Sequence, residues 1–206
     1  MAQLSPKDAA RQAALPLAAS SEALRHHIAA ATPRDRKTEL GQFMTPEPVA
    51  RFMAAMFRPT QGPYALLDPG AGLGALATAA LDRWSRGELG NGKIHVVAHE
   101  IDPRLRLHLA EVLARYRGDR GAIHIAGGDY LASAVEALEA GRREYSHAIL
   151  NPPYKKIATT SEARLLCRRA GLETVNLYSA FVGLALAQLR PGGQLVAIIP
   201  RSFCNG

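Results

Sequence analysis

The sequence is poor in the residues that build disulfide frameworks and metal centres. Only two of its 206 residues are cysteines, Cys167 and Cys204, and they lack metal-binding spacing. The seven histidines show no ligand spacing either. A disulfide-stabilised scaffold and a zinc site are therefore not expected. The cysteine content is that of a protein in a reducing compartment, so we expect a cytoplasmic location.

Long apolar runs are also absent. No run is long enough to cross a bilayer, and the first residues lack the charged start and apolar core of a secretory signal. We therefore expect neither membrane association nor export. Internal repeats and low-complexity tracts are not visible, and no serine or cysteine is placed beside a base that would make it a nucleophile.

Positive charge is in excess. Lysine and arginine total 25 against 18 acidic residues, which gives a net charge of +7 and an isoelectric point near 9.8. Such a balance favours a polyanionic partner, although many basic proteins have none. The length corresponds to one domain, and a hydrophobic content of 48% is sufficient for a buried core.

Strand and helix patterns alternate along most of the chain. Residues 1–40 are expected to form a helical arm, and residues 41–206 the main domain. The expected strands are residues 64–67, 94–98, 123–126, 147–150 and 195–199, and the helices between them are residues 75–84, 105–116, 133–140 and 176–189. This alternation predicts an α/β fold, a doubly wound parallel sheet with helices on both faces.

A further helix is expected to precede the first strand. Thr45 is expected to cap it, with Pro46 at the first helical position. Apolar residues follow at helical spacing, and that face is predicted to be core: Val49, Phe52, Met53 and Met56.

Polar side chains stand where the predicted strands end. Asp68, Glu100, Asp129 and Asn151 each follow such a strand. Ligands of open parallel sheets bind over the carboxyl ends of the strands. These four residues are therefore the primary candidates for a binding site.

A glycine-rich turn follows Asp68. Gly70, Gly72 and Gly74 let the backbone approach a ligand closely, at the amino terminus of the next helix. Residues 70–75 also fit the looser pattern of dinucleotide-binding folds. Asp68 favours S-adenosylmethionine as the cofactor, because a carboxylate suits a ligand with an ammonium group and would repel a pyrophosphate.

The other two acids have more than one interpretation. Glu100 is placed to accept hydrogen bonds from two ribose hydroxyls, but a solvated acid at a strand end would look the same. Asp102 lies close enough to complicate that assignment, and with Pro103 it is expected to cap the next helix. Asp129 follows two glycines and would accept from the exocyclic amine of an adenine, unless it only forms a turn.

The tetrapeptide Asn151-Pro152-Pro153-Tyr154 is the most informative segment. Two prolines fix two backbone torsions and remove two N–H donors, and each restricts the residue before it. The resulting stiff turn would hold a planar amino group such as adenine N6, whose lone pair attacks poorly until acceptors hold both hydrogens. We expect Asn151 Oδ1 and the Pro152 carbonyl to be those acceptors and Tyr154 to stack on the ring. An Asn-Pro pair alone would indicate only a turn.

Basic residues follow this tetrapeptide. Lys155 and Lys156 come directly after it, and Arg164, Arg168 and Arg169 lie in the next segment. At the mouth of a site they would contact phosphates. A solvated basic helix face is an equally simple interpretation.

Taken together, these motifs resemble the N6-adenine DNA methyltransferases of restriction–modification systems. The resemblance runs from about Leu40 to the last residue. Its segments are Gly41-Gln42-Phe43-Met44-Thr45-Pro46, residues 68–74, Glu100, Asp129, residues 151–154, Asn176-Leu177-Tyr178 with Phe181, and Pro200-Arg201-Ser202-Phe203-Cys204-Asn205-Gly206. Their joint order is much more specific than any one of them.

The resemblance implies a class I S-adenosylmethionine-dependent methyltransferase of Rossmann-like fold. Phe43 and Thr45 would help to hold the methionine part of the cofactor, and Tyr178 and Phe181 would lie on the substrate side. The implied reaction is in-line methyl transfer to an adenine N6 flipped out of duplex DNA. The implied partners are double-stranded DNA, a recognition domain after the catalytic one, and a cognate endonuclease.

The family fold continues beyond the last residue printed here. It adds two strands as an edge hairpin, a second aromatic that stacks on the flipped base, and the recognition domain. We therefore expect this chain to be able to bind the cofactor, whether weakly or strongly, but to be unable to methylate a defined site alone. An open fifth strand would be prone to aggregation unless another chain covers it.

Two other functions remain compatible with these residues. One is methylation of another planar nitrogen, in RNA adenine or a protein glutamine. The other is a catalytically silent fragment that only binds the cofactor. The segment from Gln42 to Pro46 and the basic balance favour nucleic acid over protein.

Overall fold

The structure is a computed structural model that describes residues 45–201 and 203. The expected helical arm at residues 1–40 and the expected cofactor contact Phe43 lie outside the described residues, as do Ser202 and residues 204–206.

The described residues form a five-stranded parallel sheet with helices between the strands. The strands are β1 (Tyr64–Asp68), β2 (Ile94–His99), β3 (Gly121–Ala126), β4 (Tyr145–Leu150) and β5 (Leu189–Ala197). The helices are α4 (Glu47–Ala55), α5 (Ala75–Ser85), α6 (Pro103–Ala114), α7 (Tyr130–Glu139), α8 (Glu162–Arg169) and α9 (Leu177–Ala187). The strand order is β3-β2-β1-β4-β5, and every neighbouring pair is parallel. The predicted α/β fold is confirmed.

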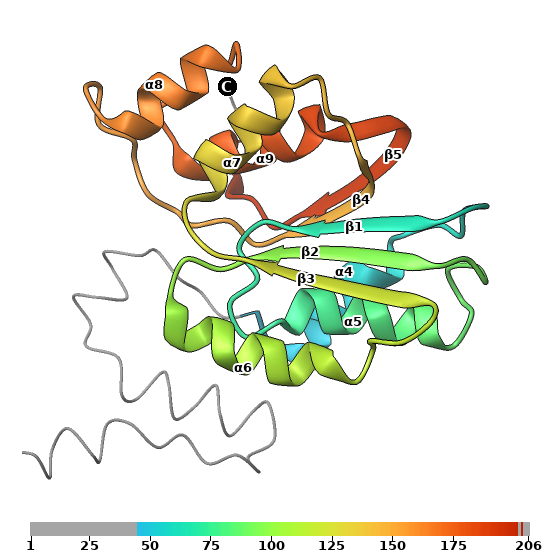
Figure 1. Cartoon of the computed structure of the whole chain (residues 1–206). Helices are drawn as coiled ribbons and strands as arrows, with labels where there is room; N and C mark the ends of the chain where they lie inside the picture. Colours follow the sequence, from blue (N-terminus) through green and yellow to red (C-terminus); the bar gives the residue numbers. More distant parts are fainter. Residues whose placement is uncertain (1–44, 202, 204–206) are drawn as a thin grey trace, which may run out of the picture. The chain divides into compact units, whose positions relative to one another are not determined.

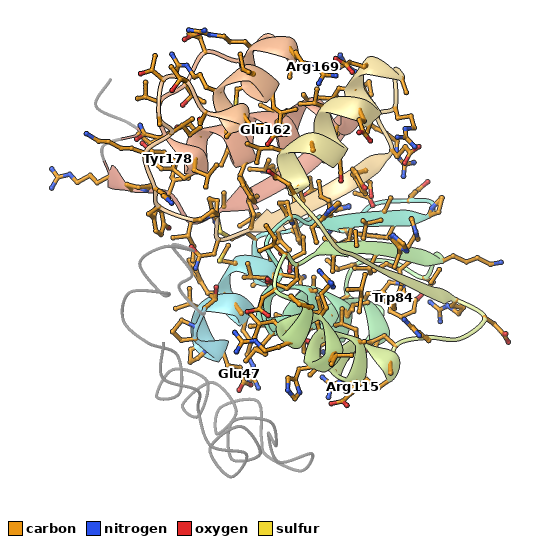
Figure 2. The ribbon with its side chains drawn as sticks, turned by 60° about the vertical axis from the view of Figure 1, so that its left-hand side comes forward. Glu47, Trp84, Arg115, Glu162, Arg169 and Tyr178 are labelled. Carbon is orange, nitrogen blue, oxygen red and sulfur yellow. The ribbon has the colours of Figure 1, made fainter. Side chains whose placement is uncertain are left out.

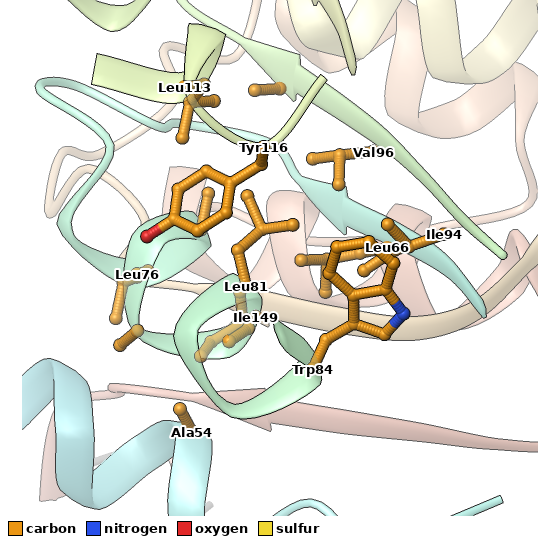
Figure 3. Packing of buried hydrophobic residues seen from close by; sticks show 14 of the residues in the cluster. Ala54, Leu66, Leu76, Leu81, Trp84, Ile94, Val96, Leu113, Tyr116 and Ile149 are labelled. Atoms are coloured by element: carbon orange, nitrogen blue, oxygen red, sulfur yellow. The ribbon is translucent and has the colours of Figure 1, made fainter. Parts of the chain in front are cut away.

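Helices cover both faces of this sheet (Figure 1). Helices α4, α5 and α6 lie on one face, where Trp84, Leu81 and Tyr116 pack against strand residues such as Leu66 (Figure 3). Helices α7, α8 and α9 lie on the other face and bury a second core with residues such as Leu184. All five residues of the central strand β1 are buried because both of its faces are covered.

The buried face of α4 differs from the predicted one. Val49, Phe52 and Met56 are exposed by 38%, 69% and 57%, and of the four predicted core residues only Met53 is buried. The buried set is Ala50, Met53, Ala54 and, just after the helix, Phe57. Both frames have helical spacing, but α4 packs on α5 through its small alanines, which permit a closer approach.

The final strand begins earlier than the sequence predicts. Helix α9 ends at Ala187, and Pro191, Gly192 and Gly193 are part of β5 instead of a separate stop signal. The register along β4 jumps from Leu189 to Gln194, so these residues form a bulge.

A buried histidine of β4 contacts residues of the neighbouring strands β1 and β5. The ring of His147 stacks on Tyr64 with centroids 4.2 Å apart, and its Nε2 lies 3.2 Å from Nε2 of Gln194. The Gln194 amide also pairs with both main-chain groups of Arg58, at 2.8 and 3.1 Å. Since Gln194 donates there, His147 Nε2 is an acceptor and Nδ1 donates to Ser146 Oγ at 2.8 Å. Burial, followed by the nearby Arg190 charge, lowers the pKa of His147 to about 4.

This lowered pKa predicts a loss of stability in mild acid. The unfolded chain binds a proton at His147 below pH 6.5, whereas the folded protein does not until about pH 4. Between these values the residue should reduce the free energy of unfolding by roughly 1.4 kcal/mol per pH unit. We would measure the free energy of unfolding by urea denaturation at pH 7, 6 and 5. Its slope against pH should be smaller for His147→Asn than for wild type. His95→Asn, at an exposed position of β2, should keep the wild-type slope; equal slopes in all three proteins would contradict the assignment.

Candidate functional site

The carboxyl ends of three neighbouring strands are joined by main-chain hydrogen bonds. The N–H of Ala71, in the glycine loop, donates to the His99 carbonyl at 2.9 Å, and the N–H of Glu100 donates to the Ala126 carbonyl at 3.0 Å. The loop after β1 is thereby held beside the end of β2, and the end of β2 beside the end of β3. Asp68, Glu100 and Asn151 follow or end adjacent strands, as the sequence predicts.

Asp68 is fully buried beneath the glycine loop. Its Oδ2 accepts from the N–H of Ala77 at 3.2 Å, in the first turn of α5. Among the described residues, Oδ1 has no hydrogen-bond partner although it is buried. Burial raises the pKa of Asp68 to about 7, and the nearby Glu100 carboxylate adds to the increase. Hydrogen bonds from the N–H groups of Ala77 and Gly70 favour the ionised form, but burial outweighs them, so a cationic group would stabilise the anion further.

Glu100 links the glycine loop to the turn after β2. Its Oε2 accepts from the N–H of Gly72 at 2.9 Å, and its Oε1 accepts from the N–H of Asp102 at 2.8 Å. The side chain is 4% exposed, and burial raises its pKa. The carboxylate thus has a structural task that the sequence does not reveal. Its expected contact with ribose hydroxyls stays a prediction.

Two glycines of the loop after Asp68 have different surroundings. Gly74 has a φ of +82°, and a Cβ there would approach Cδ1 of Leu109 to 2.7 Å. Gly70 is exposed, and a Cβ there would meet the ring of Phe181 at 3.7 Å. Gly74 is therefore required by the backbone and by packing against α6, whereas Gly70 leaves the loop surface open beside Phe181.

The other two acids cap helices. Asp102 Oδ1 accepts from the N–H of Arg104 at 2.9 Å and caps α6, as predicted. Asp129 Oδ1 accepts from the N–H of Leu131 at 2.8 Å and caps α7. Asp129 is also exposed. Its expected contact with an adenine amine stays a prediction, beside this observed role.

The Asn-Pro-Pro-Tyr turn is held through the side chain of its first residue. Asn151 Nδ2 donates to Thr45 Oγ1 at 3.2 Å. The Tyr154 hydroxyl lies 3.1 Å from Asn151 Oδ1 and 3.2 Å from the carbonyl of Ile198, which follows β5. Three segments that are distant in the sequence therefore meet at this turn. The sequence gives no signal for the links to Thr45 and Ile198, because each bridges positions far apart in the chain.

Thr45 does not have the capping role that the sequence predicts. The N-cap of α4 is Pro46, without a side-chain hydrogen bond, and the helix begins at Glu47. The Thr45 hydroxyl turns instead towards Asn151 and is only 6% exposed. The prediction is wrong because a partner 106 positions away replaces the local one.

Aromatic rings continue from the turn along α9. The ring of Tyr178 lies 6.2 Å from that of Tyr154 and 6.2 Å from that of Phe203. Tyr178 is on the α8 side of the molecule, away from Glu47 on α4 (Figure 2). Phe181 is separate from this group and packs against Tyr130, with centroids 5.0 Å apart. Tyr178 thus adjoins the turn, whereas Phe181 adjoins the glycine loop.

The basic residues divide into two groups. Lys155 and Lys156 are exposed directly after the turn, as a contact to phosphates would require. The three arginines of α8 are paired with acids: Arg164 with Glu173 and the Thr174 carbonyl, Arg168 with Glu173, and Arg169 with Glu139. Their pairing favours a structural role over the phosphate contact considered from the sequence.

Two other kinds of site are not found among residues 45–201 and 203. No group of three or more metal-ligating side chains is present in this part of the chain. No helix in the same part is long and apolar enough to cross a membrane.

Comparison with known proteins gives a consistent family. Residues 27–204 match the family described as N-6 DNA Methylase. Type II methyltransferase M.BsuBI of Bacillus subtilis is 44% identical over 180 residues, and M.PstI of Providencia stuartii is 40% identical over 178. Each alignment covers 82% of this chain and 35% of the relative. The chain therefore spans about a third of the length of these curated relatives. An rRNA adenine N-6-methyltransferase of Streptomyces fradiae is 36% identical over 124 residues, covering 59% of this chain and 33% of that protein.

Solved structures share the fold at low sequence identity. A Listeria monocytogenes protein assigned to the class I S-adenosylmethionine-dependent methyltransferases has a TM-score of 0.61 and 18% identity, covering 91% of this chain and 56% of its own. The methyltransferase subunit of a type I restriction-modification system from Streptococcus thermophilus has a TM-score of 0.61 and 20% identity, covering 88% and 39%. At such identities the likeness shows the fold alone, which is that of the class I methyltransferases.

The buried acid beneath the glycine loop gives a testable pH dependence. The unfolded chain releases the Asp68 proton above pH 3.8, but the folded protein holds it until about pH 7, so rising pH favours unfolding in this window. Asp68→Asn removes the effect. Its free energy of unfolding should improve relative to wild type by roughly 1.4 kcal/mol per pH unit between these values. Urea denaturation of both proteins at pH 5 and 8 measures this, and a constant difference would show that the carboxylate is compensated.

Proposed function

Because the chain belongs to the N-6 DNA methylase family, we propose that it forms the catalytic part of an enzyme that methylates adenine N6 in double-stranded DNA. The enzyme would act within a restriction–modification system and use S-adenosylmethionine, the cofactor that the family and fold imply. The observation that carries the proposal is the Asn151 amide, held in an Asn-Pro-Pro-Tyr turn at the end of the strand next to β1.

The residues beneath the glycine loop fit this cofactor. The buried Oδ1 of Asp68 has no hydrogen-bond partner among the described residues, which suits a ligand with an ammonium group. The exposed surface of Gly70 permits close approach of a ligand. We therefore assign the methionine part to the loop around Asp68 and the ribose to Glu100. When bound, S-adenosylmethionine supplies a methyl group on a positively charged sulfur, which keeps the bonding electron pair as the methyl carbon is transferred.

The protein's contribution would be to orient the nucleophile. The lone pair of an adenine amine is delocalised into the ring, and two acceptors that hold both hydrogens leave it aimed at the methyl carbon. Asn151 Oδ1 and the Pro152 carbonyl would be these acceptors. The Tyr154 hydroxyl would then donate to the Ile198 carbonyl, already 3.2 Å away, while its ring stacks on the base. Alignment of this kind accounts for much of the rate in such transfers.

The polymer is assigned from the surroundings of the turn. Lys155 and Lys156 are exposed beside it, and the net charge of +7 favours a polyanion. Tyr178 adjoins Tyr154 and would extend the surface on which a flipped base stacks. Recognition of a particular sequence, and any cognate endonuclease, would depend on parts that this chain does not share with its longer relatives.

RNA adenine is the second candidate substrate. The likeness to the rRNA adenine N-6-methyltransferase favours it. The two acceptors of the turn, Asn151 Oδ1 and the Pro152 carbonyl, form a clamp that would hold the same amine. The double-stranded DNA assignment is preferred because the two more similar relatives are type II methyltransferases.

Cofactor binding can be tested without any nucleic acid. Calorimetric titration of the 206-residue chain with S-adenosylmethionine should give a Kd that rises at least tenfold in Asp68→Asn. Asp119→Asn is the matched control, because Asp119 is exposed and lies before β3, at the opposite end of the strands. Since Asp68→Asn should gain stability relative to wild type at pH 8, unfolding would not explain its weaker binding. A folded wild type that does not bind would refute the cofactor assignment.

Methyl-label transfer tests the reaction. Duplex DNA, RNA and a glutamine-containing protein should be offered separately to the chain and to the complete product of its gene, with the highest incorporation expected in duplex DNA. Asn151→Ala should reduce the rate at least 100-fold without changing the Kd of the cofactor, because it removes one of the two acceptors. Asn91→Ala, in an exposed turn before β2, should retain the wild-type rate. Preferential labelling of RNA or protein would assign a different substrate, and an active Asn151→Ala enzyme would exclude the clamp.

A further inference from the structure

The Asn151 amide needs a restraint that its own backbone does not give. The last torsion of an asparagine side chain is broad and nearly two-fold, so the amide plane is defined only by what it contacts. The two prolines after it stiffen the main chain and leave this torsion untouched. A clamp that must present an oxygen in one direction therefore depends on a neighbour of the amide.

Thr45 is such a neighbour. Its Oγ1 accepts from Asn151 Nδ2 at 3.2 Å, and the Tyr154 hydroxyl lies at the opposite end of the amide, 3.1 Å from Oδ1. A hydrogen bond at the nitrogen end fixes the plane without using the oxygen. Tyr154 has the Ile198 carbonyl as an alternative acceptor, so Oδ1 can be given over to another donor.

The position of Thr45 is itself well defined. Pro46 follows it with a φ of −60°, and Pro48 stands in the first turn of α4. Ala50 and Met53 then bury the helix against α5. The Thr45 hydroxyl therefore contacts Asn151 from a rigid segment that lies 106 positions earlier in the chain.

We propose that Thr45 is a positioning residue of the clamp, whose hydroxyl holds the Asn151 amide so that Oδ1 faces the target amine. The proposal rests on the proposed function of Asn151. It assigns to Thr45 a task different from holding the methionine part of the cofactor, which is what the family resemblance implies. A positioning role would affect the methyl-transfer step and leave cofactor affinity unchanged.

Three variants separate these roles. Thr45→Val keeps the shape and removes the acceptor, and Thr45→Ser keeps the hydroxyl. Thr78→Val makes the same change in α5, where the buried Thr78 Oγ1 has no hydrogen-bond partner among the described residues. The first readout needs no activity: in ¹⁵N-labelled chain, the side-chain NH₂ resonances of Asn151, identified by their loss in Asn151→Ala, report the hydrogen bond. Hydrogen exchange at this group should be at least fivefold faster in Thr45→Val and unchanged in Thr45→Ser and Thr78→Val.

The second readout is the methyl-transfer rate in a single turnover by the complete gene product, measured with the Kd for S-adenosylmethionine. Thr45→Val should slow transfer at least tenfold, about the loss of one hydrogen bond, with a Kd within twofold of wild type, and Thr45→Ser should restore the rate. Unchanged Asn151 exchange in Thr45→Val, or a Kd that rises as much as the rate falls, would overturn the proposal. If neither the wild type nor any variant transfers methyl groups, the proposed function fails. The exchange data still decide whether Thr45 holds the amide.

Discussion

The shape of the site depends on the buried carboxylate of Glu100. It accepts from the N–H groups of Gly72 and Asp102, and so holds the glycine loop after β1 to the turn after β2. Gly72 has a φ of +54°, which glycine adopts readily, and the carboxylate satisfies its N–H. A carboxylate has about four acceptor sites, so these two bonds are compatible with additional bonds to ribose hydroxyls. Loop geometry and ligand binding would then share one side chain.

Two buried acids beside one another also decide which ligand the loop can accept. Burial raises the pKa of both Asp68 and Glu100, and the Glu100 charge further raises that of Asp68. A pyrophosphate over this loop would add negative charge to a site that already disfavours it, whereas a cation would stabilise the ionised acids. The glycine spacing alone fits dinucleotide folds as well. The buried Asp68 therefore distinguishes a site for a cationic ligand from a dinucleotide site, which the glycines do not.

The sequence predicts those features that local pattern determines. Apolar runs and glycine turns locate all five strands and the acids at their ends, because a parallel sheet must bury its strands and expose its carboxyl ends. The errors concern residues whose role depends on a distant partner. The face of α4 follows from the alanines that pack on α5, and the Thr45 hydroxyl turns to Asn151. No local pattern contains these partners. Residue spacing therefore predicts that a helix forms, but it does not predict which face of the helix is buried or which partner a polar side chain contacts.

Strand order explains why one residue before α4 can contact the turn at the end of β4. The chain leaves β1 towards β2 and β3, then returns to place β4 on the other side of β1, so the order reverses between β1 and β4. The glycine loop and the Asn-Pro-Pro-Tyr turn stand on the two sides of that reversal. The segment that enters α4 provides Thr45, and the end of β5 provides the Ile198 carbonyl near the Tyr154 hydroxyl. The clamp is therefore a tertiary structure, and the tetrapeptide alone does not determine its geometry.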